Sequence, residues 1–141
     1  MSTRSAIGIQ RKDGTIEAIY CHCNGYPTGN GVILFNCYND VKKINKLLKL
    51  GDISILGKNP QSKKEYWGEE DRGDDCLAYN DRGENTHSIK FKDYKEFFEC
   101  YKEAWCEFVY LFNPETKTWK VQDTCKRKAN NLGNVLSNER Y

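Results

Sequence analysis

The segment at residues 3–22 constrains the fold most strongly, because it reads as two strands joined by a tight turn. Ile7 and Ile9 alternate with small residues ahead of "KDG", and Ile16 and Ile19 follow in "TIEAIYCH". An Asp-Gly pair between two such segments is a strong signal for a β-hairpin. We therefore predict an N-terminal hairpin whose four isoleucines are directed to the core.

A second hairpin is predicted over residues 106–122, near the other end of the chain. The segments "CEFVYLF" and "TWKVQ" flank "NPETK", in which Pro114 takes a position typical of turns. Residues 76–80 and the segment "THSIKF" predict two further short strands.

Helices are predicted between the hairpins. In "DYKEFFECYKEAW", Asp93 is the N-cap and the aromatic residues repeat with helical spacing, which predicts a core-facing helix over residues 93–105. The residues on that face are Tyr94, Phe97, Phe98, Tyr101 and Trp105. A second amphipathic helix is predicted to begin after Asn39 or Asp40, with Gly51 as its C-cap.

Together these elements predict a single α+β domain over residues 1–141. We expect a mainly antiparallel sheet with an N-terminal and a C-terminal hairpin, and helices packed on one face. Residues 57–75 are polar and are predicted to form a long loop or insertion. Residues 123–141 are predicted to form a polar tail.

Composition argues against some partners and compartments. No apolar run approaches the ~20 residues of a membrane span, and the start "MSTRSAIGIQRKDG" lacks the apolar region of a signal peptide. We therefore expect a cytoplasmic protein without a membrane partner. The net charge is only +2, so direct binding of nucleic acid is not expected from the charge of the whole molecule.

Charge is nonetheless segregated along the chain. Basic residues cluster at residues 42–49 and 126–128, and an acidic stretch lies between them at residues 65–75. Its acidic residues are Glu65, Glu69, Glu70, Asp71, Asp74 and Asp75. The stretch is interpreted either as a solvated loop or as an acidic surface that faces a partner.

The cysteines and histidines do not predict a metal site, a cofactor or a catalytic residue. The chain has seven cysteines, an odd number, and no C-x-x-C pair, so a disulfide framework is not expected. Cys21 and Cys23 alternate with His22 in an extended segment, and the second ligand pair of a structural zinc site is missing. No known signature of a cysteine nucleophile is present.

The stretch "CHCNGYPTGNG" leaves three interpretations open. It joins a strand to a helix that begins near Asn30, which suits anion binding, but its glycine spacing matches no known phosphate-binding loop. Alternatively, His22 and Asn24, with Arg4 on the paired strand and Tyr26 nearby, grip a polar group. The third interpretation is an internally hydrogen-bonded corner whose glycines adopt positive φ.

The triplet "DRG" occurs twice and brings two arginines into polar segments. Arg72 and Arg82 can bind a carboxylate or a phosphate bidentately. Asp71 and Asp81 are the adjacent acidic residues, so ion pairs that stabilise the two turns are the alternative.

Motifs in the first 56 residues carry a resemblance to a known family. They are "MSTRS", the hairpin, "CHCNGYP" and "GDIS", and together they resemble a family of small uncharacterised proteins found widely in phages and prophages. The motif of that family is C-H-W-D-G-Y-P. This chain has Cys23 in place of the tryptophan and Asn24 in place of the aspartate. An amide cannot act as a general base, so the departure favours binding or structure over catalysis.

The resemblance implies a phage setting, in which small accessory proteins often act against host defence by binding. The first hypothesis is an anti-defence inhibitor, similar to anti-CRISPR proteins, that binds a host defence protein or complex without a cofactor. The second is a protein that binds a small ligand such as a nucleotide, and the third is a hydrolase-type enzyme. The candidate ligand- or partner-binding residues are Arg4, His22, Asn24, Tyr26, Glu69, Glu70, Asp71 and Arg82.

Overall fold

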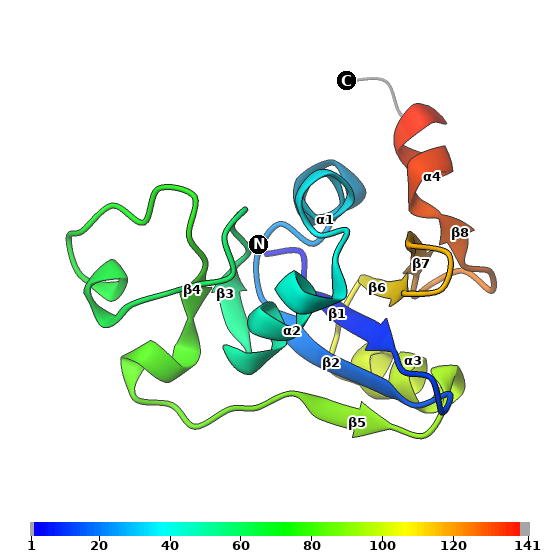
Figure 1. The fold of residues 1–141 in the computed structure, drawn as a ribbon, viewed down its shortest axis with the longest axis horizontal. Coiled ribbons are helices and arrows are strands. Elements are labelled where there is room, and N and C mark those ends of the chain that lie inside the picture. The colour runs from blue at the N-terminus through cyan, green and yellow to red at the C-terminus, as the bar shows by residue number, and fades with distance from the viewer. Residues whose placement is uncertain (1, 139–141) are drawn as a thin grey trace.

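Both predicted hairpins are present and lie side by side in the sheet (Figure 1). The computed structural model describes residues 2–138. β1 (Ser5–Gln10) pairs antiparallel with β2 (Ile16–Cys21), and β6 (Phe108–Asn113) pairs antiparallel with β7 (Thr118–Asp123). β1 and β6 run parallel to each other and so join the two hairpins.

Shorter strands extend the sheet on both sides. They are β3 (Ile53–Ile55), β4 (Leu77–Ala78), β5 (Ile89–Phe91) and β8 (Asn130–Asn131). Across the described residues the strand order is β4-β3-β2-β1-β6-β7-β8, and β5 also pairs with β2. Only the β1–β6 and β2–β3 pairs within this part of the chain are parallel, so the α+β class and the mainly antiparallel sheet are confirmed.

The three helices between the hairpins lie close to their predicted positions, whereas the fourth lies in the segment 123–141 that is predicted to be a polar tail, of which residues 139–141 lie outside the described part. They are α1 (Val32–Cys37), α2 (Val41–Lys49), α3 (Tyr94–Glu103) and α4 (Leu132–Asn138), with a π-helical turn at Pro27–Gly31 and 3-10 turns at Lys64–Trp67 and Tyr79–Arg82. Asp40 is the N-cap of α2 and Asp93 is the N-cap of α3. Each carboxylate accepts a hydrogen bond from the backbone N–H three residues later. Gly51 ends α2 with φ at 74°. Among the residues in the structure, no helix is long and apolar enough to span a membrane.

The prediction that helices pack on one face of the sheet is wrong. α1, α2 and α4 contribute to the core on one face, and α3 covers the other (Figure 1). The reason is that the central strands are apolar on both faces. In β6, Tyr110 and Phe112 are buried on the α1 side, whereas Val109 and Leu111 are buried on the α3 side. The four isoleucines of the first hairpin are likewise buried, but on both faces.

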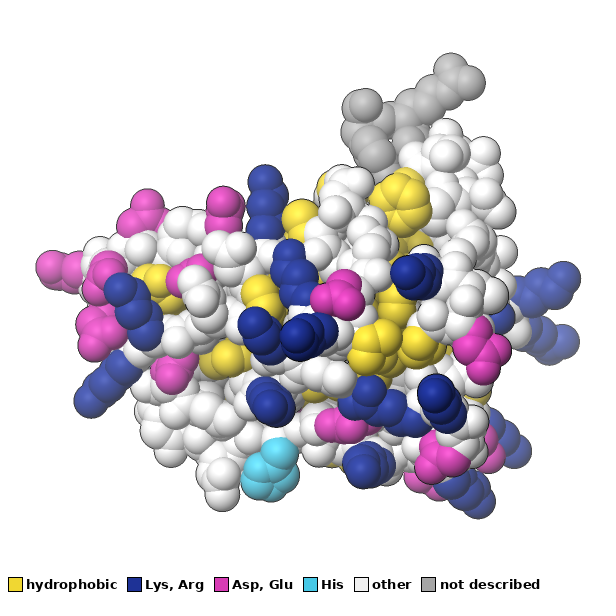
Figure 2. Space-filling view, viewed as in Figure 1, with side chains coloured by type: hydrophobic (Ala, Val, Ile, Leu, Met, Phe, Trp, Pro, Cys, Tyr) yellow, Lys and Arg dark blue, Asp and Glu magenta, His cyan; other side chains and the backbone are white. Residues whose placement is uncertain are grey.

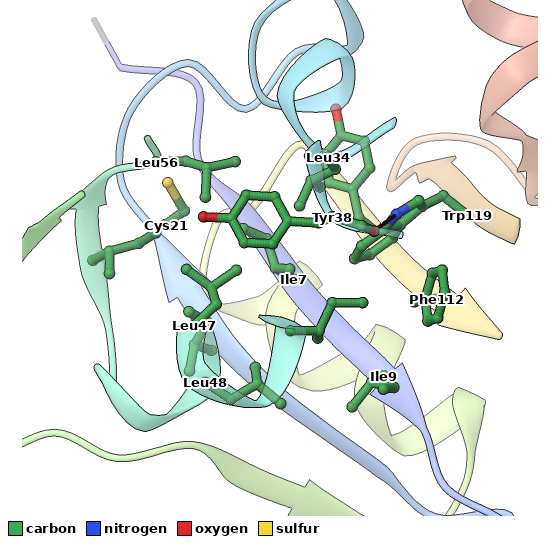
Figure 3. Close-up of a cluster of buried hydrophobic side chains, with 14 of the residues drawn as sticks. Ile7, Ile9, Cys21, Leu34, Tyr38, Leu47, Leu48, Leu56, Phe112 and Trp119 are labelled. Carbon is green, nitrogen blue, oxygen red and sulfur yellow. Dashed lines mark hydrogen bonds between the residues drawn. The ribbon is translucent and has the colours of Figure 1, made fainter. Parts of the chain in front are cut away.

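The larger core lies on the α1 and α2 side and surrounds Tyr38 (Figure 3). The side chains of Leu34 and Leu47 lie near its ring. The Tyr38 hydroxyl donates to the Gly57 carbonyl at 2.8 Å, and its own carbonyl accepts from the Trp119 indole at 2.8 Å. Tyr38 therefore links β7 to the polar segment that follows β3.

The smaller core is built by the aromatic face of α3. Phe97 and Tyr101 are buried, and both rings contact Phe91 of β5, with centroids 5.8 Å and 5.6 Å apart. Tyr94 and Phe98 are half-buried at its edge. The prediction of a core-facing aromatic stripe is confirmed for these four residues of the helix.

Trp105 departs from that stripe. α3 ends at Glu103, and Trp105 adopts a left-handed conformation with φ at 69°. This turn takes the indole out of the helical face, and 78% of Trp105 is exposed. The prediction that Trp105 belongs to the core is therefore wrong.

Candidate functional site

The corner at residues 21–31 is held by internal hydrogen bonds. The backbone N–H groups of Gly25, Gly29 and Asn30 all donate to backbone carbonyls, at 2.8–2.9 Å. These groups are therefore not available to an anion, unlike the free N–H groups of an anion-binding helix start. The geometry matches the interpretation of an internally bonded corner.

The glycines of the corner allow other backbone atoms to approach them closely, and their φ angles are not positive. A Cβ on Gly25 would lie 2.8 Å from the Thr3 carbonyl oxygen, and one on Gly29 would lie 2.5 Å from that of Asn24. The residue with left-handed backbone is Asn24, at φ 60°, a conformation that asparagine adopts more readily than most residues. The prediction of positive φ at these glycines is wrong.

Asn30 is the buried centre of the corner. Its amide nitrogen lies 3.2 Å from Ser5 Oγ, 3.3 Å from Cys21 Sγ and 3.0 Å from the Cys23 carbonyl oxygen. Burial raises the pKa of the Cys21 thiol to about 12. A thiol with such a pKa stays protonated at neutral pH, which does not suit a nucleophile.

The four candidate binding residues near the corner form two separate groups. His22 Nδ1 lies 2.8 Å from the hydroxyl of Tyr20, whereas the side-chain Oδ1 of Asn24 accepts a long, 3.5 Å bond from the hydroxyl of Tyr26. Burial raises the pKa of Tyr20 to about 12, and the charge of Arg4 opposes this shift. Arg4 and His22 therefore both lie near Tyr20, which packs against the α3 core. Among the described residues, no hydrogen bond joins this group to Asn24 and Tyr26.

A second candidate site is the segment at residues 57–84, called the acidic lobe from here on. It projects at one end of the molecule, with β3 and β4 at its base (Figure 1). The backbone N–H of Gly57 donates to Cys76 Sγ at 3.2 Å, and the Cys76 thiol donates to the Asn59 carbonyl at 3.3 Å. Since Tyr38 also binds Gly57, the base of the acidic lobe belongs to the core.

Asp75, which is half-buried, gathers the polar side chains of the acidic lobe. Its carboxylate accepts hydrogen bonds from Tyr66 at 2.5 Å, Gln61 at 3.0 Å and Asn59 at 3.2 Å. The bond from Tyr66 is the largest cause that lowers the pKa of Asp75. Arg72 donates to the Asp75 carbonyl at 2.6 Å. The predicted polar loop is therefore an ordered segment with its own hydrogen-bonded centre.

The remaining carboxylates of the stretch lie on the outside of the acidic lobe (Figure 2). Glu70 pairs with Lys63 at 2.7 Å, and Asp71 accepts from the Gly73 N–H at 3.0 Å. Three further exposed side chains form no hydrogen bond or ion pair with another described residue: Glu65, Glu69 and Asp74.

Arg82 lies against two aromatic rings of the acidic lobe. Its guanidinium carbon is 4.5 Å from the ring centroid of Trp67 and 5.0 Å from that of Tyr79. Its Nε donates to Glu84 at 2.8 Å, so the predicted ion pair with Asp81 is wrong. The arginine of the first "DRG" triplet likewise bonds a backbone carbonyl and not the adjacent aspartate.

The sequence pattern does not identify Trp67 and Tyr79 as partners of Arg82. The available signal is that Trp67 lies among charged residues in the sequence. A large aromatic ring in such a segment indicates a contact with another side chain. The hydrogen bond from its indole to the Ala78 carbonyl, at 2.7 Å, depends on the fold of the lobe and leaves no pattern in the sequence.

Comparison with known proteins adds no assignment. The chain matches no protein-family model, no curated protein sequence and no solved structure. Within residues 2–138, no group of three or more His, Cys, Asp or Glu side chains is placed to hold a metal ion.

Proposed function

We propose that this chain is a phage- or prophage-type accessory protein that inhibits a host defence complex by binding it through the acidic lobe. The observation that carries this proposal is the construction of the lobe. Its acidic side chains lie on a segment that is fixed by the hydrogen bonds of Asp75 and, at the base, by those of Tyr38 and Cys76. A preorganised surface loses little conformational entropy on binding, which favours affinity.

The charge of the acidic lobe indicates the kind of partner. Residues 65–75 hold six carboxylates against one arginine, although the whole chain carries a net charge of +2. An acidic projection complements a basic surface, such as the channel in which a host complex holds nucleic acid, and speeds the encounter with it.

The aromatic side of the lobe supports the same role. Trp, Tyr and Arg are the residue types that most often dominate binding energy at protein interfaces. Such a group is formed by Trp67, which lies within the acidic stretch, and by Tyr79 and Arg82, which follow it; Arg82 is exposed. These three side chains supply the aromatic contact area that the carboxylates of the acidic stretch lack.

Affinity capture from the lysate of a bacterial host tests the proposal. The double variant Glu69→Lys/Asp74→Lys reverses charge on the lobe at two side chains that form no hydrogen bond or ion pair with another described residue. The matched control, Glu103→Lys/Glu115→Lys, makes the same change of charge outside the lobe. We expect the wild type and the control to retain a nucleic-acid-binding complex, identified by mass spectrometry, that the lobe variant does not retain. Equal retention by all three proteins would rule out the lobe as the binding surface.

A further inference from the structure

An open groove lies between α3 and the segment that follows β7, away from the acidic lobe. Its volume is about 470 Å³, within the range of ~300–1,000 Å³ that is usual for sites of small molecules. Tyr94 and Phe98 line it, one helical turn apart, and their rings are stacked with centroids 6.1 Å apart and planes at 22°. The groove therefore offers half-buried aromatic surface to a ligand.

The groove is also strongly basic. Its lining includes four cations and, among the described residues, no carboxylate. The cations are Lys95, Lys102, Lys126 and Arg127. Lys95 Nζ lies 4.0 Å from a Glu99 carboxylate oxygen, and Lys102 Nζ lies 6.0 Å from the Phe98 ring centroid. Lys126 and Arg127, in contrast, form no ion pair within residues 2–138. Positive charge that the protein does not neutralise favours an anionic ligand.

A chain of hydrogen bonds fixes the wall of the groove that carries two of these cations. The Tyr94 hydroxyl donates to the Gln122 side-chain carbonyl at 2.6 Å, and the Gln122 amide donates to the Lys126 carbonyl at 2.8 Å. The Lys126 N–H in turn donates to the Asp123 carbonyl at 2.9 Å. The turn that bears Lys126 and Arg127 is thus tied to the aromatic wall on α3.

We propose that this basic groove binds a nucleotide unit. Lys126 and Arg127 contact the phosphate, since a guanidinium and an ammonium are the usual partners of phosphate oxygens. The base lies against Tyr94 and Phe98, because stacking on aromatic rings accepts any base. The low net charge of the molecule predicts weak attraction at long range, but the groove concentrates positive charge locally. This site does not depend on the function proposed for the acidic lobe.

The nucleotide unit has two possible sources, a free mononucleotide or a single-stranded nucleic acid, and binding measurements separate them. The probes are AMP, followed by isothermal titration calorimetry, and a fluorescein-labelled ten-nucleotide single-stranded RNA, followed by fluorescence anisotropy. The test variant is Lys126→Ala/Arg127→Ala. The matched control is Lys42→Ala/Lys46→Ala, which removes two exposed cations from α2.

We expect the groove variant to weaken binding of the nucleotide probe at least tenfold, and the control to change it less than threefold. For the RNA, the groove variant also reduces the magnitude of the slope of log affinity against log salt concentration by about 0.7, the value for one phosphate that is no longer neutralised. Phe98→Leu weakens binding without changing that slope, because it removes stacking alone. Binding of AMP identifies a mononucleotide site, and binding of the RNA alone identifies a single-strand site.

Three results would overturn the proposal. One is no binding of either probe to the wild type. Another is an equal loss in the groove variant and the control, which would show attraction by overall charge. The third is groove-dependent binding of a polyglutamate peptide with no effect of nucleotides, which would assign the groove to acidic protein segments.

Discussion

The hydroxyl of Tyr110 donates a 2.6 Å hydrogen bond to the backbone carbonyl of Gly25. Tyr110 lies in β6, so this bond ties the C-terminal hairpin to the corner that follows the N-terminal hairpin. Both residues are buried. The shape of the corner therefore depends on a residue far away in the sequence as well as on its own hydrogen bonds.

Tyr110→Phe should reduce the free energy of unfolding by about 1–3 kcal/mol, because the buried Gly25 carbonyl loses this donor. Tyr26→Phe is the control, since Tyr26 is exposed and its hydroxyl makes a long bond to the Asn24 side chain and no other hydrogen bond within residues 2–138. Urea unfolding of the three proteins measures the difference. Equal stability of the two variants would contradict the role assigned to the Tyr110 hydroxyl.

Tyr101→Phe should not reduce the free energy of unfolding, in contrast to Tyr110→Phe. The Tyr101 hydroxyl is buried and, within the described residues, has no hydrogen-bond partner. An unsatisfied buried polar group costs about 1–3 kcal/mol, and phenylalanine keeps the ring contacts with Phe91 and Phe97. We expect the melting temperature to rise or stay unchanged. A clear fall would show that the hydroxyl has a partner in solution.

Phe97→Ala should reduce the free energy of unfolding by about 3–5 kcal/mol, because Phe97 is fully buried in the α3 core. Trp105→Ala is the matched aromatic control on the same segment and should change stability by no more than about 0.5 kcal/mol. Thermal and urea unfolding compare the two variants. A larger loss from Trp105→Ala would place the indole in the core after all.

Asp52→Asn should raise stability at neutral pH. Burial raises the pKa of Asp52, while its carboxylate accepts from the Tyr20 N–H at 3.0 Å. A carboxyl with a raised pKa in the folded state binds its proton more tightly there, so its contribution to stability falls as pH rises from its ordinary value of 3.8. The amide keeps an acceptor for Tyr20 and carries no charge.

The difference between Asp52→Asn and the wild type should therefore be smallest near pH 3 and grow toward pH 7. Urea unfolding at several pH values measures it. A variant that is less stable than the wild type at pH 7 would show that the charge of Asp52 stabilises the fold.

Local signals predict most of the secondary structure. The Asp-Gly pair, the cap Asp93 and the spacing of Phe97 and Tyr101 each act within one element, so the sequence contains all that they need. Which faces of the sheet the helices cover depends on how strands far apart in the sequence pair. β1 and β6 pair in parallel although about 100 residues separate them, and a local pattern carries no signal for a contact between such distant segments. Helices on both faces follow from that pairing.

The candidate sites show the same division. The sequence marks the acidic stretch by composition and the corner by its glycines. It does not show that Asp75 gathers Tyr66, Gln61 and Asn59, because these residues meet only when the lobe has folded. It also places Arg82 beside Asp81, whereas the folded chain stacks it on Trp67.

Inhibition of the captured host complex tests the central claim most directly. Its binding to nucleic acid is measured by fluorescence anisotropy while the protein is added at increasing concentration. The acidic lobe should displace the nucleic acid, so the wild type and Glu103→Lys/Glu115→Lys should inhibit equally, and Glu69→Lys/Asp74→Lys should lose at least tenfold in potency. Full inhibition by Glu69→Lys/Asp74→Lys, or none by the wild type, would contradict the account.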